Sequence, residues 1–447
     1  MRDIIVVMSD QHSGLKTSLT DEIVQTPNIE KLAETSQYFE NAYCNFPLCV
    51  PSRMSFLSGK HPSELGILNN DVILDDKQET IADKMTKKGY RTILVGRMHF
   101  KGENQLHGFS ERYVGDITSQ FWKQKRTDLG AFKGTMKMKG CLNEFGYGTS
   151  PVLQFDETVV KKAIEILKEE SEKPIFMIVG LYGPHFPYCV EKKYFDYYFK
   201  QDLKLKDYHL NCFKEYEKMK LEADENTLQN IRSAYYGMIE KLDQQIGEIH
   251  KVVRSKSEDS LFIYTSDHGD QIGKRGLFGK KTFYEDSIKI PLIIEDLRLS
   301  SRKHSNEVSL LNLHWYLAQE IGLEIEEGLD NDKPVLVNSL IEKDGKEVLT
   351  QAVIYKRYKY VEFEDEERLF NLKVDADEKD NIINKCPKIA SELKKSLANC
   401  DIVYKNYQKR LEKLDELIKE YEKNPKEDWI RYKIKKEATV KPNRGRL

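Results

Sequence analysis

The sequence predicts an α/β fold in which a large, mostly parallel sheet is sandwiched by helices. Short apolar runs rich in Val, Ile and Leu alternate with longer amphipathic segments in the first two thirds of the chain. Such runs are typical of parallel strands that are buried on both faces of a sheet. The expected strands cover residues 4–8, 91–95, 175–179 and 261–264.

Amphipathic segments between these strands predict the covering helices. Thr26 is a suitable N-cap, with Pro27 at the first helical position, and Gly89 suits the end of a helix. Ligand sites in such sheets lie beyond the carboxyl ends of the strands. All four strands end in polar residues, which predicts an active site at that edge. The expected helices cover residues 27–35, 80–88, 156–170 and 228–254.

A smaller antiparallel sheet plus a helix is expected near the C-terminus. Its strands are short and separated by charged turns, at residues 347–355, 358–363 and 368–372. A helix is expected over 387–423, followed by a basic tail over 424–447. We therefore expect a catalytic α/β domain over residues 1–335 and a small α+β subdomain, with the helix and tail, over 336–447.

Composition excludes several classes of function. The 447 residues carry 71 Lys and Arg against 73 Asp and Glu, a net charge of −2, which argues against charge-driven nucleic-acid binding. No apolar run is long enough to span a membrane. The seven cysteines are scattered and lack CxxC spacing, which favours a reducing compartment. The chain enters its first strand without a signal peptide, so we expect a cytoplasmic protein.

The segment Cys49-Val50-Pro51-Ser52-Arg53 carries the sharpest chemical signal. A cysteine lies four residues before an arginine, in a turn that Pro51 fixes ahead of an expected helix. A helix N-terminus stabilises anions and lowers a thiol pKa, which favours a reactive cysteine. The alternative is a buried structural cysteine, as free cysteines usually are.

Together with Leu57-Ser58-Gly59, this segment resembles the signature of the type I sulfatases of the alkaline phosphatase superfamily. The resemblance extends from residue 4 to about residue 381. It implies an alkaline-phosphatase-like sheet and a Cys49 that a sulfatase maturation enzyme, a transient partner, converts to formylglycine. The nearest branch is the one that resembles choline sulfatases and phosphonate monoester hydrolases.

The resemblance also implies a metal site. Asp10, after the first strand, and Asp267-His268, after the fourth, match the family's metal-binding residues, and Cys49 would complete the set. Oxygen and imidazole ligands suit one divalent ion, Ca²⁺ or Mn²⁺. Gln11 stands where family members often carry a second Asp, and we expect it to contact substrate. Asp10 and Asp267 could instead be caps or turn residues.

Other matches imply substrate contacts. Gly96-Arg97-Met98-His99 resembles the family's Gly-Lys-x-His, with Arg97 clamping sulfate in place of Lys. Arg keeps the positive charge but cannot exchange protons near neutral pH. Asn70 resembles the Asn aimed at the sulfate or phosphonate group, and Asn69 is its near competitor. His107 we interpret as structural.

Two later matches complete the expected catalytic set. His185, in Pro184-His185-Phe186-Pro187, resembles the histidine that faces the leaving-group oxygen. Lys280 resembles the sulfate-clamping lysine, and the adjacent Lys281 is the other candidate.

The implied mechanism is nucleophilic attack by a formylglycine hydroxyl on sulfur. The metal, Arg53, Arg97 and Lys280 would neutralise the sulfate oxygens. His185, with Lys280, would protonate the departing alcohol. His99 would deprotonate the second hydroxyl as inorganic sulfate leaves.

Three functions remain open at this point. The first is a sulfatase acting on a carbohydrate or small organic sulfate, and the second is a phosphonate monoester or phosphodiester hydrolase on the same fold. The third is a non-catalytic binder of sulfated ligands. Specificity is expected from residues 117–148 and from a lid over 200–226, and the C-terminal helix could mediate a homo-oligomer. Aromatic side chains in these loops could stack on a sugar or be packing: Phe121, Trp122, Phe132, Tyr147, Tyr208, Phe213 and Tyr216.

Overall fold

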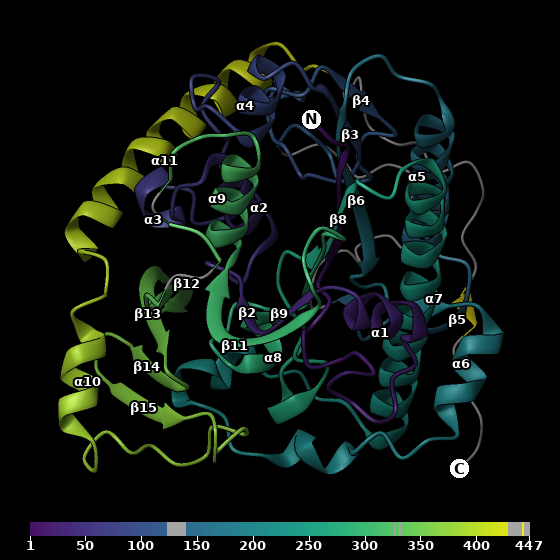
Figure 1. Ribbon diagram of the computed structural model, residues 1–447. Helices are drawn as coiled ribbons and strands as arrows, with labels where there is room; N and C mark the ends of the chain where they lie inside the picture. Colours follow the sequence, from purple (N-terminus) through teal and green to yellow (C-terminus); the bar gives the residue numbers. More distant parts are fainter. Residues whose placement is uncertain (123–139, 326, 330–331, 428–439, 442–447) are drawn as a thin grey trace.

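The main sheet of the computed structural model has nine strands and is mostly parallel, as predicted (Figure 1). The structure describes residues 1–122, 140–325, 327–329, 332–427 and 440–441. β1 pairs in parallel with β6 and β8, and β3 pairs in parallel with β6 and β4. The order across the sheet is β11 (Arg302–Ser309), β2 (Gln37–Tyr43), β10 (Leu292–Glu295), β8 (Leu261–Ser266), β1 (Ile4–Asp10), β6 (Ile175–Pro184), β3 (Arg91–Gly96) and β4 (Glu111–Tyr113), with β9 (Lys289–Ile290) on β2.

Helices cover both faces of this sheet, and β1 shows why. Ile4, Val6 and Met8 belong to one hydrophobic core, whereas Ile5 and Val7 belong to the other. Side chains alternate across a strand, so each face needs its own apolar cover. One face packs against α2 (Cys49–Ser58), α4 (Ile81–Lys87) and α9 (Leu310–Glu320), and the other against α1 (Pro27–Glu34), α5 (Pro151–Lys168) and α7 (Glu225–Lys256).

The four predicted helices are confirmed with modest changes of length. α5 starts five residues earlier than expected, because the Ser150 hydroxyl accepts a hydrogen bond from the Leu153 N–H and caps the helix. α7 runs from Glu225 to Lys256, capped by Asp224. Three further helices are short: α3 (Pro62–Leu65), α6 (Lys192–Phe199) and α8 (Glu285–Ile288).

The C-terminal sheet is antiparallel, as predicted, but it has a fourth strand at its edge. Its order is β12 (Val335–Lys343), β13 (Lys346–Tyr355), β14 (Tyr358–Glu362) and β15 (Glu367–Asn371). The domain boundary expected after residue 335 stays a prediction. A third sheet joins β5 (Gly146–Gly148), β7 (Cys189–Val190) and β16 (Val440–Lys441), so that part of the basic tail pairs with β5.

The single helix expected over 387–423 is wrong, because two helices occupy this range. α10 (Pro387–Lys394) packs on the small sheet, and α11 (Cys400–Lys423) runs along α3 at the edge of the molecule (Figure 1). The Asn399 side chain accepts a hydrogen bond from the Ile402 N–H and starts the second helix. Within the described residues, none of these helices is long and apolar enough to cross a membrane.

Candidate active site

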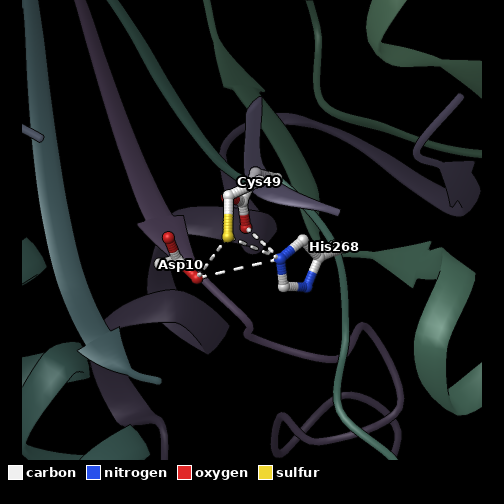
Figure 2. A group of neighbouring side chains, drawn as sticks. Asp10, Cys49 and His268 are labelled. Carbon is white, nitrogen blue, oxygen red and sulfur yellow. Dashed lines mark hydrogen bonds and ion pairs between the residues drawn. The ribbon is translucent and has the colours of Figure 1, made fainter. Parts of the chain in front are cut away.

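Four side chains with metal-binding atoms meet at the carboxyl edge of the main sheet. One ligand atom from each lies within 4.8 Å of the others, and all four side chains are buried. Figure 2 shows Asp10, Cys49 and His268 converging from β1, α2 and the segment after β8. Asp267 is the fourth member. The structure therefore brings together the whole set of residues expected to hold the metal.

The pairing of β1 with β8 produces this convergence. Ser9 lies opposite Ser266 in the parallel register, so the residues that follow them leave the sheet side by side. The Gln11 backbone N–H then donates to Asp267 Oδ1 at 3.0 Å and links the two strand ends. The carboxylates of Asp10 and Asp267 thus lie next to each other at the carboxyl edge of the sheet, where ligand sites form in such folds.

Cys49 is the first residue of α2 itself. The expectation of a separate turn before the helix is wrong, because Pro51 lies inside the first helical turn, where its missing N–H needs no partner. Cys49 Sγ lies 3.4 Å from His268 Nε2 and accepts a hydrogen bond from Lys280 Nζ at 3.0 Å. Burial and the negative charge of Asp10 raise the pKa of the thiol. The interpretation as a reactive thiolate at a helix N-terminus therefore does not fit the unmodified residue.

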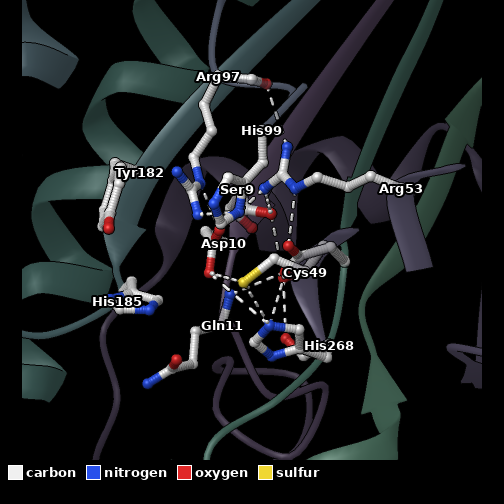
Figure 3. A network of polar contacts seen from close by, with 12 residues as sticks. Ser9, Asp10, Gln11, Cys49, Arg53, Arg97, His99, Tyr182, His185 and His268 are labelled. Atoms are coloured by element: carbon white, nitrogen blue, oxygen red, sulfur yellow. Dashed lines mark hydrogen bonds and ion pairs between the residues drawn. The ribbon is translucent and has the colours of Figure 1, made fainter. Parts of the chain in front are cut away.

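Cationic side chains surround Asp10 (Figure 3). Burial opposes ionisation of this carboxyl, but the positive charges of Arg97, Lys280 and Arg53 hold its pKa well below the usual value. Arg53 also donates from Nε to Asp267 at 2.7 Å. Asp10 therefore stays ionised although it is fully buried.

His268 has the tautomer that a metal ligand requires. Its Nδ1 lies 3.0 Å from the carbonyl oxygen of Gly269, which can only accept, so Nδ1 carries the proton. The Nε2 lone pair then faces Asp10, Cys49 and Asp267. Two carboxylates, a sulfur and an imidazole lone pair in this arrangement fit a divalent cation.

Arg97 is buried, and most of its donors are already used. Nε donates to Asp10 at 2.5 Å, Nη1 donates to Asp116 at 3.0 Å and to Thr118 Oγ1, and Nη2 donates to His99 Nδ1 at 2.9 Å. The guanidinium carbon lies 4.0 Å from the centre of the Tyr182 ring. An arginine has five N–H groups, so little of its donor capacity remains for substrate.

A pocket of about 190 Å³ opens next to the cluster. Asn70 Oδ1 accepts a hydrogen bond from the Val50 N–H at the wall of this pocket, whereas Asn69 turns away and donates to Tyr407 on α11. Of the two candidate asparagines, only Asn70 lines this pocket, and its substrate contact stays a prediction. The pocket is lined by Leu48, Cys49, Asn70, Asp71, Arg97, His99, Lys101, Thr118, Ser119, Tyr182, His185, Phe186, Lys280 and Lys281.

Gln11 does not line this pocket. Its side chain points away from Cys49 and His268 and donates to Asp270 Oδ2 (Figure 3). Its backbone φ is 70°, in the left-handed region. Gln11 lies beside Asp10, as expected. Its side chain does not face the pocket where we expected it to contact substrate, and binds Asp270 instead.

Sequence reasoning gave no role to three carboxylates that support the site. Asp116 pairs with Arg97. Asp156, on α5, accepts hydrogen bonds from the N–H groups of Tyr182 and Gly183, just ahead of His185, and burial raises its pKa to about 7. Asp270 accepts the Gly279 N–H at 2.7 Å, next to Lys280. None of the three stands in a motif that singles it out, apart from the position of Asp270 directly after His268 and Gly269.

The segment expected to form a lid does not line this pocket. It contains two short 3₁₀ helices, Leu205–His209 and Lys214–Met219, and no residue of 200–226 lines the pocket. Phe213 and Tyr216 are buried against Tyr284, and the Phe213 ring also stacks on Phe370 of β15. Trp122 donates from its indole nitrogen to the Asp71 carbonyl at the pocket rim, and Phe132 lies outside the described residues.

Comparison with known proteins decides the family. The sulfatase family model matches residues 2–319. The chain belongs to the sulfatase family. The chain is 29% identical to a choline-sulfatase of Rhizobium meliloti (strain 1021) over 427 residues, covering 85% of this chain and 82% of that protein. It is also 29% identical to an arylsulfatase of Clostridium perfringens (strain 13 / Type A) over 328 residues, covering 66% of this chain and 68% of that one.

Solved structures share the fold of this sulfatase. A phosphonate monoester hydrolase of Agrobacterium radiobacter superposes with a TM-score of 0.71 at 18% identity, covering 94% of this chain and 96% of that one. A structure in complex with its substrate D-glucosamine-2-N,6-O-disulfate gives 0.70 at 18% identity, covering 95% and 99%. The family and its relatives make this sulfatase a sulfuric ester hydrolase of the alkaline phosphatase superfamily.

Proposed function

We propose that this sulfatase hydrolyses a small sulfate ester through formylglycine at position 49 and one divalent metal ion, and releases inorganic sulfate. The observation that carries the proposal is the position of Cys49. Its Sγ lies within reach of two carboxylates, an imidazole lone pair and the Lys280 ammonium, and Cys49 lines the pocket beside them. A hydroxyl at the same place would attack a sulfate group bound in that pocket.

Asp10, Cys49, Asp267 and His268 would hold the metal, which is Ca²⁺ or Mn²⁺ on the chemistry of the donors. A bound cation supplies Lewis acidity and lowers the pKa of a hydroxyl next to it. Arg53 has no free approach to substrate, because its guanidinium is buried against Asp267 and Asp10. Its role is to hold both carboxylates in place and to help keep Asp10 charged.

The remaining pocket residues bind and orient the sulfate. Lys280 supplies positive charge at the nucleophile, and the Asn70 amide group lies at the wall of the pocket. Lys280 serves the leaving-group oxygen as the proton donor. His185, which was expected to share this role, lines the same pocket but presents a lone pair at Nε2, because its proton lies on Nδ1 against the Phe186 carbonyl oxygen. Positive charge that is already in place where negative charge develops is the usual source of stabilisation in such reactions.

The charges at the pocket favour a sulfated sugar or another neutral or anionic organic sulfate over a choline ester. Lys101 and Lys281 line the pocket, and Asp71 is its one acidic residue among the described ones. A quaternary ammonium group needs open aromatic faces. Tyr182 already stacks on Arg97, and Phe186 is buried with its ring against His185, so neither ring provides an open face.

Hydrolysis assays on protein co-expressed with a sulfatase maturation enzyme test the proposal. We expect release of sulfate from an aryl sulfate and from sulfated monosaccharides, little release from choline sulfate, and none after Cys49→Ala. Faster cleavage of phenyl phosphonate than of any sulfate ester would favour the phosphonate hydrolase. Binding of sulfated sugars without turnover would favour a non-catalytic binder.

A further inference from the structure

His99 makes a hydrogen bond that fixes which of its nitrogens carries the proton. Its Nδ1 lies 2.9 Å from Nη2 of Arg97. A guanidinium group has no lone pair to offer and can only donate. Nδ1 of His99 must therefore accept, and in the neutral ring the proton is on Nε2.

Arg97 is held so that it cannot release this contact by rotating. Nη1 donates to both oxygens of Asp116, at 3.0 and 3.2 Å. Asp116 is fixed in turn by the backbone N–H and the hydroxyl of Thr118. The ring of Tyr182 stacks on the guanidinium, which is about 1% exposed. A network with this many fixed contacts has one arrangement.

The environment also keeps His99 neutral. Burial and the positive charges of Arg97 and Lys101 hold its pKa well below the usual value. A second proton would have to go on Nδ1, directly opposite an N–H of Arg97. Nε2 has no hydrogen-bond partner among the described residues, and His99 lines the pocket.

His185, in the same pocket, has the opposite tautomer. Its Nδ1 lies 2.7 Å from the carbonyl oxygen of Phe186, which can only accept, so Nδ1 carries the proton. The Nε2 atom of the neutral ring is then a lone pair. Two histidines that look equivalent in the sequence therefore offer the pocket different groups, a donor from His99 and an acceptor from His185.

We infer that Arg97, positioned by Asp116, holds His99 as the Nε2–H tautomer, so that His99 donates a hydrogen bond to an oxygen of the bound anionic ester and is not a proton acceptor. The inference revises the base role that the family resemblance implies for His99. It rests on the proposed function only for the identity of the ester. Arg97 and Asp116 become positioning residues, and His185 keeps the free imidazole lone pair.

Nitrogen NMR of the metal-loaded protein labelled with [¹⁵N]histidine tests the tautomer directly. The chain has ten histidines, and the His99→Gln spectrum assigns the missing signals. Throughout the neutral pH range, we expect the nitrogen chemical shift of His99 Nδ1 to be that of an unprotonated ring nitrogen. The shift of His99 Nε2 should be that of a protonated one. The reverse pattern, or a charged ring, would overturn the inference. The spectrum needs no turnover, so a protein that hydrolyses no sulfate ester but shows Nε2–H would refute only the proposed function.

Replacements of Asp116 test its positioning role. Asp116→Asn keeps one acceptor for Arg97 and should leave the His99 signals in place. Asp116→Ala removes both acceptors, and we expect signals of both neutral tautomers. Thermal unfolding confirms that each variant is folded. An unchanged His99 spectrum in the folded Ala variant would show that Asp116 has no such role.

A pair of His99 variants separates donation from proton transfer. A Gln amide can place an N–H near the Nε2 position, whereas Asn reaches only to the Nδ1 position. We expect His99→Asn to lose about 10- to 100-fold in kcat/KM, the value of one hydrogen bond to a charged group, and His99→Gln to show a clearly smaller loss than the Asn variant. Equal losses of about 10²–10⁴-fold in both folded variants would indicate acid–base catalysis and contradict the inference.

Discussion

Arg53 is the side chain whose replacement best tests the electrostatics of the metal cluster. It is fully buried, and it donates to Asp267 at 2.7 Å, to Asp10 at 3.3 Å and to the carbonyl oxygen of Arg97 at 3.1 Å. Arg53→Met removes the charge and should lower the free energy of unfolding by about 3–5 kcal/mol, as for other broken buried pairs. Arg53→Lys keeps the charge, but one ammonium group cannot reach all three acceptors. We expect it to lose about 1.5–3 kcal/mol.

Urea unfolding in EDTA measures these changes in the free energy of unfolding. The dependence of that free energy on urea concentration should be the same in each variant, so that a shifted midpoint reports stability. Added Mn²⁺ or Ca²⁺ should stabilise the Met variant more than the wild type, because the ion replaces part of the missing positive charge. Lys87→Met removes an exposed ion pair with Glu79 and serves as the control, with an unchanged midpoint. A Met variant as stable as the wild type in EDTA would refute the dependence of the two carboxylates on Arg53.

Three further predictions follow from the site and from the buried histidines. Lys280→Met should lose about 100-fold or more in kcat on an aryl sulfate. Lys281→Met, at the rim of the pocket, should chiefly raise KM. Equal effects of the two changes would contradict the assignment of Lys280 as the lysine at the nucleophile. The purified His268→Ala variant should remain folded, and elemental analysis should find less than one Ca²⁺ or Mn²⁺ ion per chain. His61 is buried and has a pKa of about 4. Between about pH 6.5 and 4, this histidine is therefore protonated in the unfolded chain and neutral in the folded one. The free energy of unfolding should therefore fall as pH drops from about 6.5 to 4, by up to about 1.4 kcal/mol per pH unit for each such histidine, and His61→Gln should flatten this slope.

The buried part of the sheet could be predicted from the sequence, but its outer strands could not. Strands covered on both faces are continuous apolar runs, which are easy to recognise. Gln37–Tyr43 and Arg302–Ser309 carry polar and charged residues because they lie toward one edge of the sheet. Leu292–Glu295 is only four residues long and antiparallel to its neighbours. Their pairing is set by the tertiary fold.

The boundary between α10 and α11 was present in the sequence as a capping signal. Asn399 is a strong N-cap residue, and its side chain caps α11. The apolar periodicity on both sides of it suggested one continuous helix. Capping chemistry should therefore take precedence over periodicity where a cap residue interrupts a long pattern.

The candidate site was predicted in its central residues and missed in its support. Asp10, Cys49 and His268 come together because motif residues follow strands that end at one edge of the sheet. The role of Asp116 depends on where the guanidinium of Arg97 lies. No spacing rule encodes such contacts, which arise from packing between loops.

The mass of the Cys49 peptide is the most direct test of the central claim. Protein co-expressed with a sulfatase maturation enzyme is digested, and the peptide is compared with the same peptide from protein made without that enzyme. Conversion of the thiol to the aldehyde lowers the mass by about 18 Da, and we predict this shift together with sulfate release. A folded, metal-binding protein that keeps an unmodified Cys49 and still cleaves sulfate esters would contradict the account.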